Sequence, residues 1–185
     1  MKESTKQLQV FLCHSSGDKP AVRALYQKLH SDGFAPWLDE ENLLAGQDWQ
    51  LEIPIAVRTS DVVLVCLSRG SVTKTGYVQK EIKYALDVAD EQPEGTTFVI
   101  PIKLEECDVP QRLRRWHWVN YFETSGHERL VRALQHRATE LGLENNAELL
   151  SANNHFQSLS ASYIERAFQH ARLALKERQP GHLEK

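Results

Sequence analysis

The sequence lacks the motifs that mark the commonest nucleotide-binding and hydrolytic sites. It contains no G-x-G-x-x-G, no G-x-x-x-x-G-K-[ST], no G-x-S-x-G and no H-E-x-x-H. A dinucleotide-binding fingerprint, a P-loop, a nucleophile elbow and a zincin helix are therefore excluded. The eight histidines are scattered singly, and we expect no metal site because zinc needs several ligands at regular spacing.

Long hydrophobic runs and an excess of positive charge are also missing. The longest apolar stretch, Val62 to Leu67, is far shorter than the roughly 18 to 20 residues that cross a bilayer, and the N-terminus has no apolar signal region. The net charge is −3, from 22 basic and 25 acidic residues. We therefore expect no direct binding to nucleic acid or to a membrane. Three cysteines without paired spacing fit reduced thiols in the cytoplasm.

Short apolar segments alternate with segments of helical period, which is the pattern of a parallel sheet covered by helices. The aliphatic run at 61–67 predicts a central strand, and Pro36 places the strand that contains it at the sheet margin. We expect polar loops at 39–48 and 68–76. The predicted strands are 8–13, 34–38, 61–67, 96–102 and 116–122, and the predicted helices are 19–31, 48–58, 77–90 and a closing helix after Gly126.

The chain divides into three parts by composition. Residues 1–7 read as a tail and residues 8–143 as one α/β domain. Residues 145–160 are rich in Asn, Ser, Ala and Leu, and a helical spacing of apolar residues returns at 163–176. We therefore expect a linker and a C-terminal helical extension at 144–185.

Ligands of open parallel sheets bind beyond the carboxyl ends of the strands, and three predicted loops leave that edge, at 14–18, 39–48 and 68–76. The helix after the third loop begins near Tyr77, so Glu81 lies about one turn into it and is expected to face the cleft. Cys13 precedes His14, but neighbours on a strand point to opposite faces. A buried core thiol is therefore favoured over a nucleophile and base.

Four segments occur in an order and spacing that resemble the Toll/interleukin-1 receptor (TIR) domain family over about residues 7–142. They are VFLCHSSGD, WLDEENLLAGQDW at the position of the family's BB loop, DVVLVCLS, and GYVQKEIKYAL. The resemblance implies a flavodoxin-like fold with five parallel strands in the order 2-1-3-4-5. It also implies one of two functions, which are cleavage of NAD+ at the nicotinamide-ribose bond and scaffolding by TIR-to-TIR contact.

The same resemblance implies roles for individual residues. Glu81 occupies the place of the family's essential glutamate, and Tyr77 stands where the family often has tryptophan. Trp49 matches an aromatic residue that lines the nucleotide site, and Asp39 and Gly46 match the ends of the mobile BB loop. The serines and the aspartate of the first loop are expected to contact ribose or phosphate; they are Ser15, Ser16 and Asp18. NAD+ is implied as a substrate, with no bound cofactor.

Each of these residues also has a purely structural interpretation. A glutamate on an amphipathic helix is usually solvated, and Trp49 could instead be a core residue at the start of its helix. Ser16 and Asp18 could be helix caps. We expect Trp37, Trp116 and Trp118 to pack within strands.

The leading hypothesis is a prokaryotic NAD-cleaving TIR protein in immune defence, including antiviral defence, or in signalling. Its products are nicotinamide and ADP-ribose or a cyclic ADP-ribose, and self-assembly into a homo-oligomer through the BB loop activates it. The alternative is a non-catalytic TIR-TIR adaptor. A receiver domain shares the fold but needs an acidic pair after the first strand and an aspartate after the third, where this chain has His14-Ser15 and Ser68-Arg69.

Overall fold

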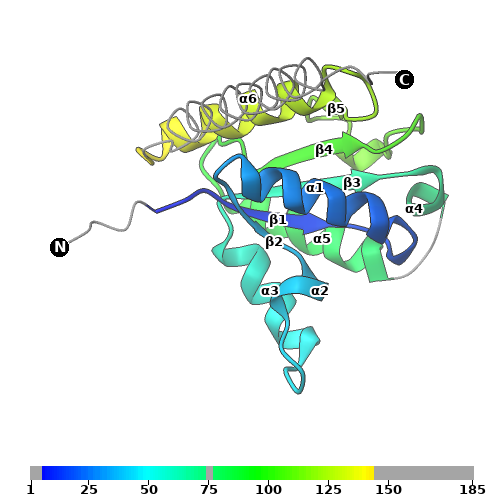
Figure 1. Cartoon of the computed structure of the whole chain (residues 1–185), viewed down its shortest axis with the longest axis vertical. Coiled ribbons are helices and arrows are strands. Elements are labelled where there is room, and N and C mark those ends of the chain that lie inside the picture. Colours follow the sequence, from blue (N-terminus) through cyan, green and yellow to red (C-terminus); the bar gives the residue numbers. More distant parts are fainter. Residues whose placement is uncertain (1–5, 74–76, 144–185) are drawn as a thin grey trace, which may run out of the picture. The chain divides into compact units, whose positions relative to one another are not determined.

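A parallel five-stranded sheet forms the centre of the domain (Figure 1). The computed structural model describes residues 6–73 and 77–143, and at 77–79 and 81 it describes the backbone alone. The expected extension at 144–185 and most of the expected tail lie outside these residues. The strand order is β2-β1-β3-β4-β5, which confirms the predicted order. The strands are β1 (Gln9–Cys13), β2 (Ala35–Trp37), β3 (Val62–Leu67), β4 (Val99–Lys103) and β5 (Val119–Asn120).

Helices connect successive strands, as parallel pairing requires. Two of them, α1 (Lys19–Ser31) and α5 (Tyr77–Asp90), have the predicted bounds. Proline lies in the first turn of α1, where its missing N–H costs nothing, and Gly33 follows the helix with a φ of 86°. The remaining helices are η1 (Ser16–Asp18), α2 (Asp39–Asn42), α3 (Trp49–Thr59), α4 (Arg69–Thr73), η2 (Gln111–Leu113) and α6 (Gly126–Glu140).

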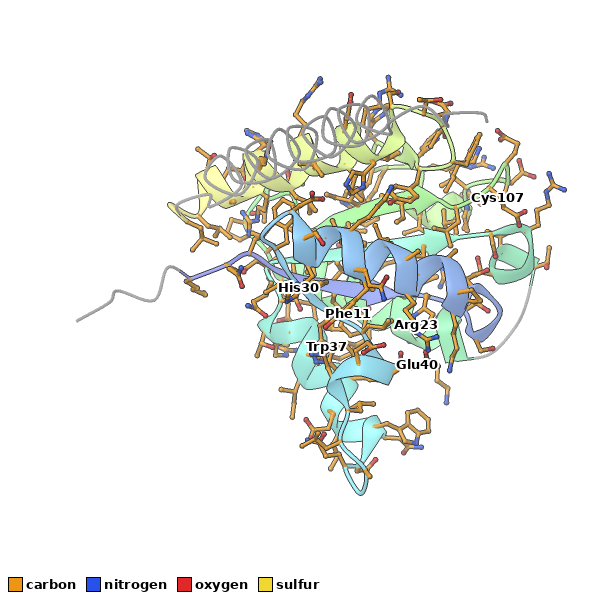
Figure 2. All side chains as sticks on the ribbon, viewed as in Figure 1. Phe11, Arg23, His30, Trp37, Glu40 and Cys107 are labelled. Carbon is orange, nitrogen blue, oxygen red and sulfur yellow. The ribbon has the colours of Figure 1, made fainter. Side chains whose placement is uncertain are left out.

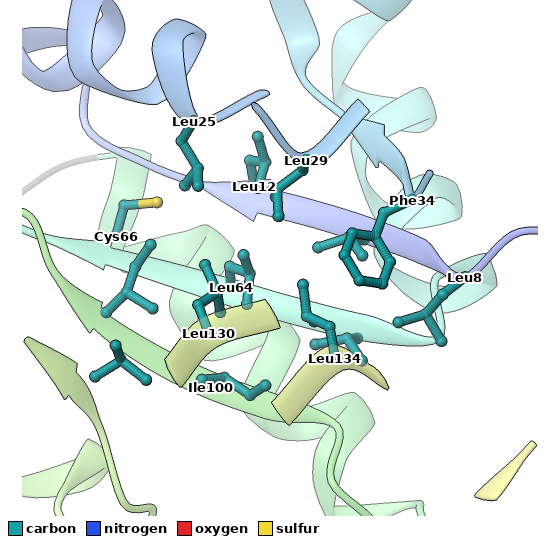
Figure 3. Packing of buried hydrophobic residues seen from close by; sticks show 14 of the residues in the cluster. Leu8, Leu12, Leu25, Leu29, Phe34, Leu64, Cys66, Ile100, Leu130 and Leu134 are labelled. Atoms are coloured by element: carbon teal, nitrogen blue, oxygen red, sulfur yellow. The ribbon is translucent and has the colours of Figure 1, made fainter. Parts of the chain in front are cut away.

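Two hydrophobic cores lie on opposite faces of the sheet, because successive strand residues point to opposite sides. In β3, Val62, Leu64 and Cys66 face the core made with α1 and α6, which Figure 3 shows. The alternate residues Val63, Val65 and Leu67 face α3 and α5. All six are buried. The prediction of a central strand covered on both faces is therefore confirmed.

The sheet margins depart from the sequence prediction. Trp37 packs in β2 as expected and stacks on Phe11 of β1 with ring centroids 5.0 Å apart (Figure 2). The predicted strand 116–122 contracts to the two residues of β5, however, and the strand predicted at 96–102 begins only at Val99. Trp116 and Trp118 consequently lie before β5, where the Arg115 guanidinium covers the Trp116 ring at 3.9 Å. The prediction that these two tryptophans pack within a strand is wrong.

The expected loops are partly helical. The segment 39–48 begins with α2, in which the acidic side chains of the first turn favour a helical N-terminus. The segment 68–76 contains α4, whose first turn is closed by hydrogen bonds between Ser68 and Ser71. In the part of the chain that the structure describes, no helix is long and apolar enough to cross a membrane.

Gly126 begins α6 at a place where a larger residue does not fit. A Cβ atom added there would lie 2.5 Å from the carbonyl oxygen of Asn120 and 2.6 Å from that of Tyr121. These neighbours are backbone atoms of β5 and of the residue that follows it, so they cannot rotate away. We expect Gly126→Ala to lower the free energy of unfolding by about 2 kcal/mol or more, measured by urea denaturation.

Gly70→Ala is the matched control for this substitution. Gly70 lies in α4, and the nearest atom to its added Cβ is the Ser68 Oγ at an ordinary contact distance of 3.7 Å. The control is expected to be neutral or slightly stabilising, since alanine favours helices. Equal effects of the two substitutions would contradict the steric argument.

Candidate functional site

The carboxyl ends of β1, β2 and β3 lie at one edge of the sheet. Polar residues follow β1 and β3 directly, and they follow β2 after the buried Leu38. The register pairs Cys13 of β1 with Val65 of β3 and Phe11 with Trp37 of β2. The loops that follow these strands are therefore neighbours, as the sequence predicts. Hydrogen bonds and an ion pair connect them.

The loop after β1 is joined to the loop after β3 by a buried hydroxyl. The Oγ of Ser68 donates to the Asp18 carboxylate at 3.0 Å, and it also accepts the backbone N–H of Ser71 at 3.1 Å. Asp18 forms no side-chain cap on α1, and Ser15, which precedes η1, forms none either. The capping interpretation is therefore wrong for Asp18, whose carboxylate contacts Ser68 instead.

The two serines of the loop after β1 differ in their exposure to solvent. Ser15 is buried and its carbonyl oxygen accepts the backbone N–H of Asp18 at 2.8 Å. Ser16 is exposed and begins η1. Of these two predicted site residues, Ser16 is the one that solvent reaches.

His14 is a residue of this edge that the sequence analysis did not assign to the site. Its ring is buried, and its Nδ1 lies 3.1 Å from the carbonyl oxygen of Leu12, which can only accept a hydrogen bond. The Nδ1 atom therefore carries a proton, and Nε2 lies 3.8 Å from Asp39 Oδ1. This distance is within reach of an ion pair but too long for a direct hydrogen bond. The sequence feature that could have identified His14 as a site residue is its position directly after a predicted strand.

Asp39 begins α2, and the next residue anchors that helix to α1. The Glu40 carboxylate forms ion pairs with Lys19 and Arg23, both at 2.5 Å, and Figure 2 shows Arg23 and Glu40 side by side. The hydrogen bond from Lys19 lowers the pKa of Glu40 below its ordinary value, and the same bond raises the pKa of Lys19. These contacts hold the start of the predicted BB loop against α1.

The remainder of the predicted BB loop is exposed, apart from the half-buried Leu43. Gly46 has a φ of 94°, a conformation that glycine adopts without strain. Asp48 caps α3 by accepting the backbone N–H of Gln50 at 2.9 Å. Trp49, the first residue of α3, keeps 44% of its surface exposed. The interpretation of Trp49 as a core residue is therefore wrong, because a large part of its surface faces solvent.

Helix α5 brings two further predicted residues to the sheet. Tyr77 is its first residue and Glu81 lies in its second turn, one position before the buried Ile82. The side chains of Tyr77 and Glu81 lie outside the described residues. One turn later, the Tyr84 hydroxyl accepts a hydrogen bond from Arg58 of α3 at 3.3 Å. The expectation that Glu81 faces the cleft therefore stays a prediction.

The chemical groups described at this edge are carboxylates, hydroxyls and one imidazole. They suit hydrogen bonding to a polyhydroxyl ligand such as ribose. Within the ranges 6–73 and 77–143, no group of three or more His, Cys, Asp or Glu residues could hold a metal ion.

Sequence comparison places the domain among known proteins. The family model described as TIR domain matches residues 10–135. The chain is 31% identical over 101 residues to the NAD(+) hydrolase TcpA of Theionarchaea archaeon (strain DG-70-1), a match that covers 54% of this chain and 30% of that protein. It is 29% identical over 104 residues to the uncharacterized protein y4cD of Sinorhizobium fredii, covering 56% of this chain and 16% of that protein. The matches thus span less than a third of either relative.

Structure comparison supports the same fold. The TIR domain of the Toll-related receptor TRR-2 from Hydra magnipapillata superimposes with a TM-score of 0.57 and 19% identity, covering 68% of this chain and 97% of that domain. A prokaryotic SEFIR domain gives a TM-score of 0.54 and 18% identity, covering 69% and 99%.

The ion pairs of Glu40 make stability depend on pH. The folded pKa of Glu40 is lowered, so its stabilising contribution is present above its ordinary pKa of 4.5 and is lost as the pH falls through the folded value. We expect Glu40→Gln to lower the melting temperature at pH 7 and to have no effect below the folded pKa, as measured by thermal melts across pH.

Salt provides a second check on this assignment. Because the pairs are exposed, we expect the difference between wild type and Glu40→Gln at pH 7 to shrink at 1 M salt. Glu94→Gln, which removes an exposed glutamate from the turn before β4, is the control. A difference that persists at low pH and high salt would contradict an electrostatic origin.

Proposed function

This chain belongs to the TIR domain family, and we propose that it is an NAD+ nucleosidase that cleaves the nicotinamide-ribose bond with Glu81 as its catalytic residue. The products are nicotinamide and ADP-ribose or a cyclic ADP-ribose. NAD+ is the substrate, and the reaction needs no further cofactor. The archaeal relative named as an NAD(+) hydrolase supports this activity at the level of the family.

The reaction suits a single carboxylate. Nicotinamide in NAD+ is already cationic, so the bond from its nitrogen to C1′ of ribose breaks with the electron pair moving to that nitrogen, without prior protonation. Positive charge then develops on the ribose, where a fixed carboxylate stabilises it. The oxygen of water bonds to C1′ and its proton leaves, which gives ADP-ribose. An adenine nitrogen that reaches C1′ first gives the cyclic product.

The position of Glu81 in the chain carries the proposal. It lies in the second turn of α5, after the central strand β3 and the polar segment that starts at Ser68. The hydrogen bond from Ser68 to Asp18 and the 3.8 Å approach of His14 to Asp39 join the neighbouring loops at that edge. A ligand held there would meet hydroxyl, carboxylate and imidazole groups.

Nicotinamide release from NAD+ tests the role of Glu81. We expect Glu81→Gln to lower the rate about a hundredfold or more, because it removes the negative charge that stabilises the transition state. Nicotinamide is quantified by chromatography with concentrated or artificially clustered protein.

Asp87→Asn is the matched control, since Asp87 is an exposed acid of the same helix. It makes the same change of charge and is expected to leave the rate unchanged. Equal nicotinamide release by wild type and Glu81→Gln, or no release by either in any assembled state, would refute the catalytic proposal.

A non-catalytic interaction module is the second candidate, and a specific surface favours it. Three large apolar side chains around the predicted BB loop and on α3 are solvent-exposed: Leu44 by 72%, Leu51 by 64% and Ile55 by 56%. Leu51 and Ile55 are four residues apart and so share one face of α3. Exposed apolar clusters mark contact sites.

The same surface fits activation by self-assembly. We propose that the BB loop and the exposed face of α3 contact a second copy of the chain and complete the active site of a homo-oligomer. The setting that we propose is prokaryotic immune defence, including antiviral defence, or signalling, by depletion of cytoplasmic NAD+ or production of a nucleotide messenger.

Self-assembly predicts how the rate depends on concentration. Mass action makes the rate of the wild type rise faster than linearly with protein concentration. We expect Leu51→Ser with Ile55→Ser to lower the rate and to shift the rise to higher concentration, without lowering the melting temperature. Initial rates across a protein titration measure this.

The control is Leu141→Ser, which removes an exposed leucine at the end of α6 and is expected to change neither property. Full activity of the wild type at nanomolar protein, with a linear dependence on concentration, would contradict activation by assembly.

A further inference from the structure

A cavity lies away from the carboxyl edge of the sheet. Its volume is about 620 Å³, within the range of roughly 300–1,000 Å³ typical of small-molecule sites. Residues 95–97, which precede β4, and Val99 and Ile100, which begin it, form one wall. The cavity is therefore at the amino end of β4, whereas the candidate active site lies at the carboxyl ends of β1 to β3.

The cavity exists because β5 is short. It pairs only Val119 with Ile102 and Asn120 with Lys103, so the amino half of β4 has no neighbour on that side. Pro101 lacks the N–H that a longer ladder would need. The segment 115–118 and two turns of α6 enclose the space that a longer strand would fill.

The charged residues that line the cavity are all basic. Its walls contain three arginines, Arg115, Arg129 and Arg132, and among the residues described there none is acidic. This accumulation is notable in a chain whose net charge is −3. Three guanidinium groups at one hollow favour an anion, and their planar donors suit phosphate oxygens in particular.

The three guanidinium groups differ in how firmly they are held. Arg115 lies on the Trp116 ring and forms an ion pair with Asp90 at 2.5 Å. Arg129 approaches the exposed Glu123 at 3.7 Å, a weak pair that a ligand can replace. For Arg132, the described part of the chain provides no ion pair or hydrogen bond to its guanidinium. Arg129 and Arg132 are three residues apart on α6 and so share one face.

Aromatic rings and hydroxyl groups complete the walls. Trp116 is half-buried and Trp118 is 36% exposed, with His117 stacked beside the latter at 6.2 Å between centroids. Indole rings bind planar heterocycles by stacking. Thr96 and Thr97 add half-buried hydroxyls. Inorganic phosphate has no base and would make no stacking contact with these aromatic rings.

We propose that this cavity binds a nucleoside phosphate, with the phosphate on Arg129 and Arg132 and the base against the tryptophans. A single nucleotide fits better than a nucleic acid strand, because the three arginines gather at one hollow of an acidic chain and do not form a basic stripe along its surface. This inference does not depend on the proposed NAD+ cleavage.

Calorimetric titration of the full chain with AMP and ADP tests the proposal. We expect Arg132→Gln and Arg129→Gln each to weaken binding about tenfold or more, since each removes charged hydrogen bonds to phosphate. Trp118→Ala is expected to weaken AMP binding while leaving the weak binding of inorganic phosphate unchanged. Adenosine alone is expected to bind more weakly than AMP.

Two control variants distinguish AMP binding at the cavity from AMP binding at the candidate active site. Lys28→Gln removes one positive charge from an exposed position of α1 outside the cavity and is expected to bind AMP as the wild type does. Glu81→Gln is likewise expected to retain AMP binding. Melting curves of each variant establish that a loss of binding is not a loss of fold.

Several results would overturn the proposal. The first is that the wild type binds neither AMP nor ADP. The second is that Arg129→Gln and Arg132→Gln bind AMP as tightly as the wild type. The third is that Glu81→Gln loses AMP binding while Arg132→Gln retains it. If the protein bound a single-stranded oligonucleotide through the arginines but bound no mononucleotide, the ligand of the cavity would be a nucleic acid and not a nucleotide. Equal affinity for phosphate and AMP would reduce the site to an anion site.

Discussion

The parallel pairing of β1 with β3 is the constraint on which the candidate site depends. Its register runs from Val10 opposite Val62 to Cys13 opposite Val65, so both strands end at the same edge. Burial on two faces fixes that register, because a slip of one residue would exchange the side chains that face the two cores. The hydrogen bond from Ser68 to Asp18 depends on this alignment.

Much of the fold was predictable because its strongest signals are local and repetitive. Helices α1 and α5 show complete apolar stripes, and the aliphatic run of β3 admits only a buried strand. The errors fall where a tertiary contact outweighs local propensity. The aromatic run before and after Val119 favours a strand, but the Arg115 guanidinium covers Trp116 and the ladder reaches only Asn120.

The candidate site was predictable to a smaller extent. The position of Glu81 follows from counting residues along a helix, which needs no knowledge of side-chain contacts. The role of Asp18 could not be predicted in this way, because its hydrogen-bond partner Ser68 is fifty residues away in the sequence. His14 was overlooked because its significance lies in the approach of Asp39, which only the pairing of β1 with β2 brings near.

The two ends of β4 illustrate how one sheet creates two different environments. At its carboxyl end, β5 continues the ladder, and Lys103 is buried in an ion pair with Glu106. At its amino end the ladder is absent, and the arginines Arg115, Arg129 and Arg132 line the open flank. A cation buried beside a strand must be paired, whereas one at a hollow can remain solvated until an anion arrives. The brevity of β5 therefore determines where this acidic domain can carry an anion site.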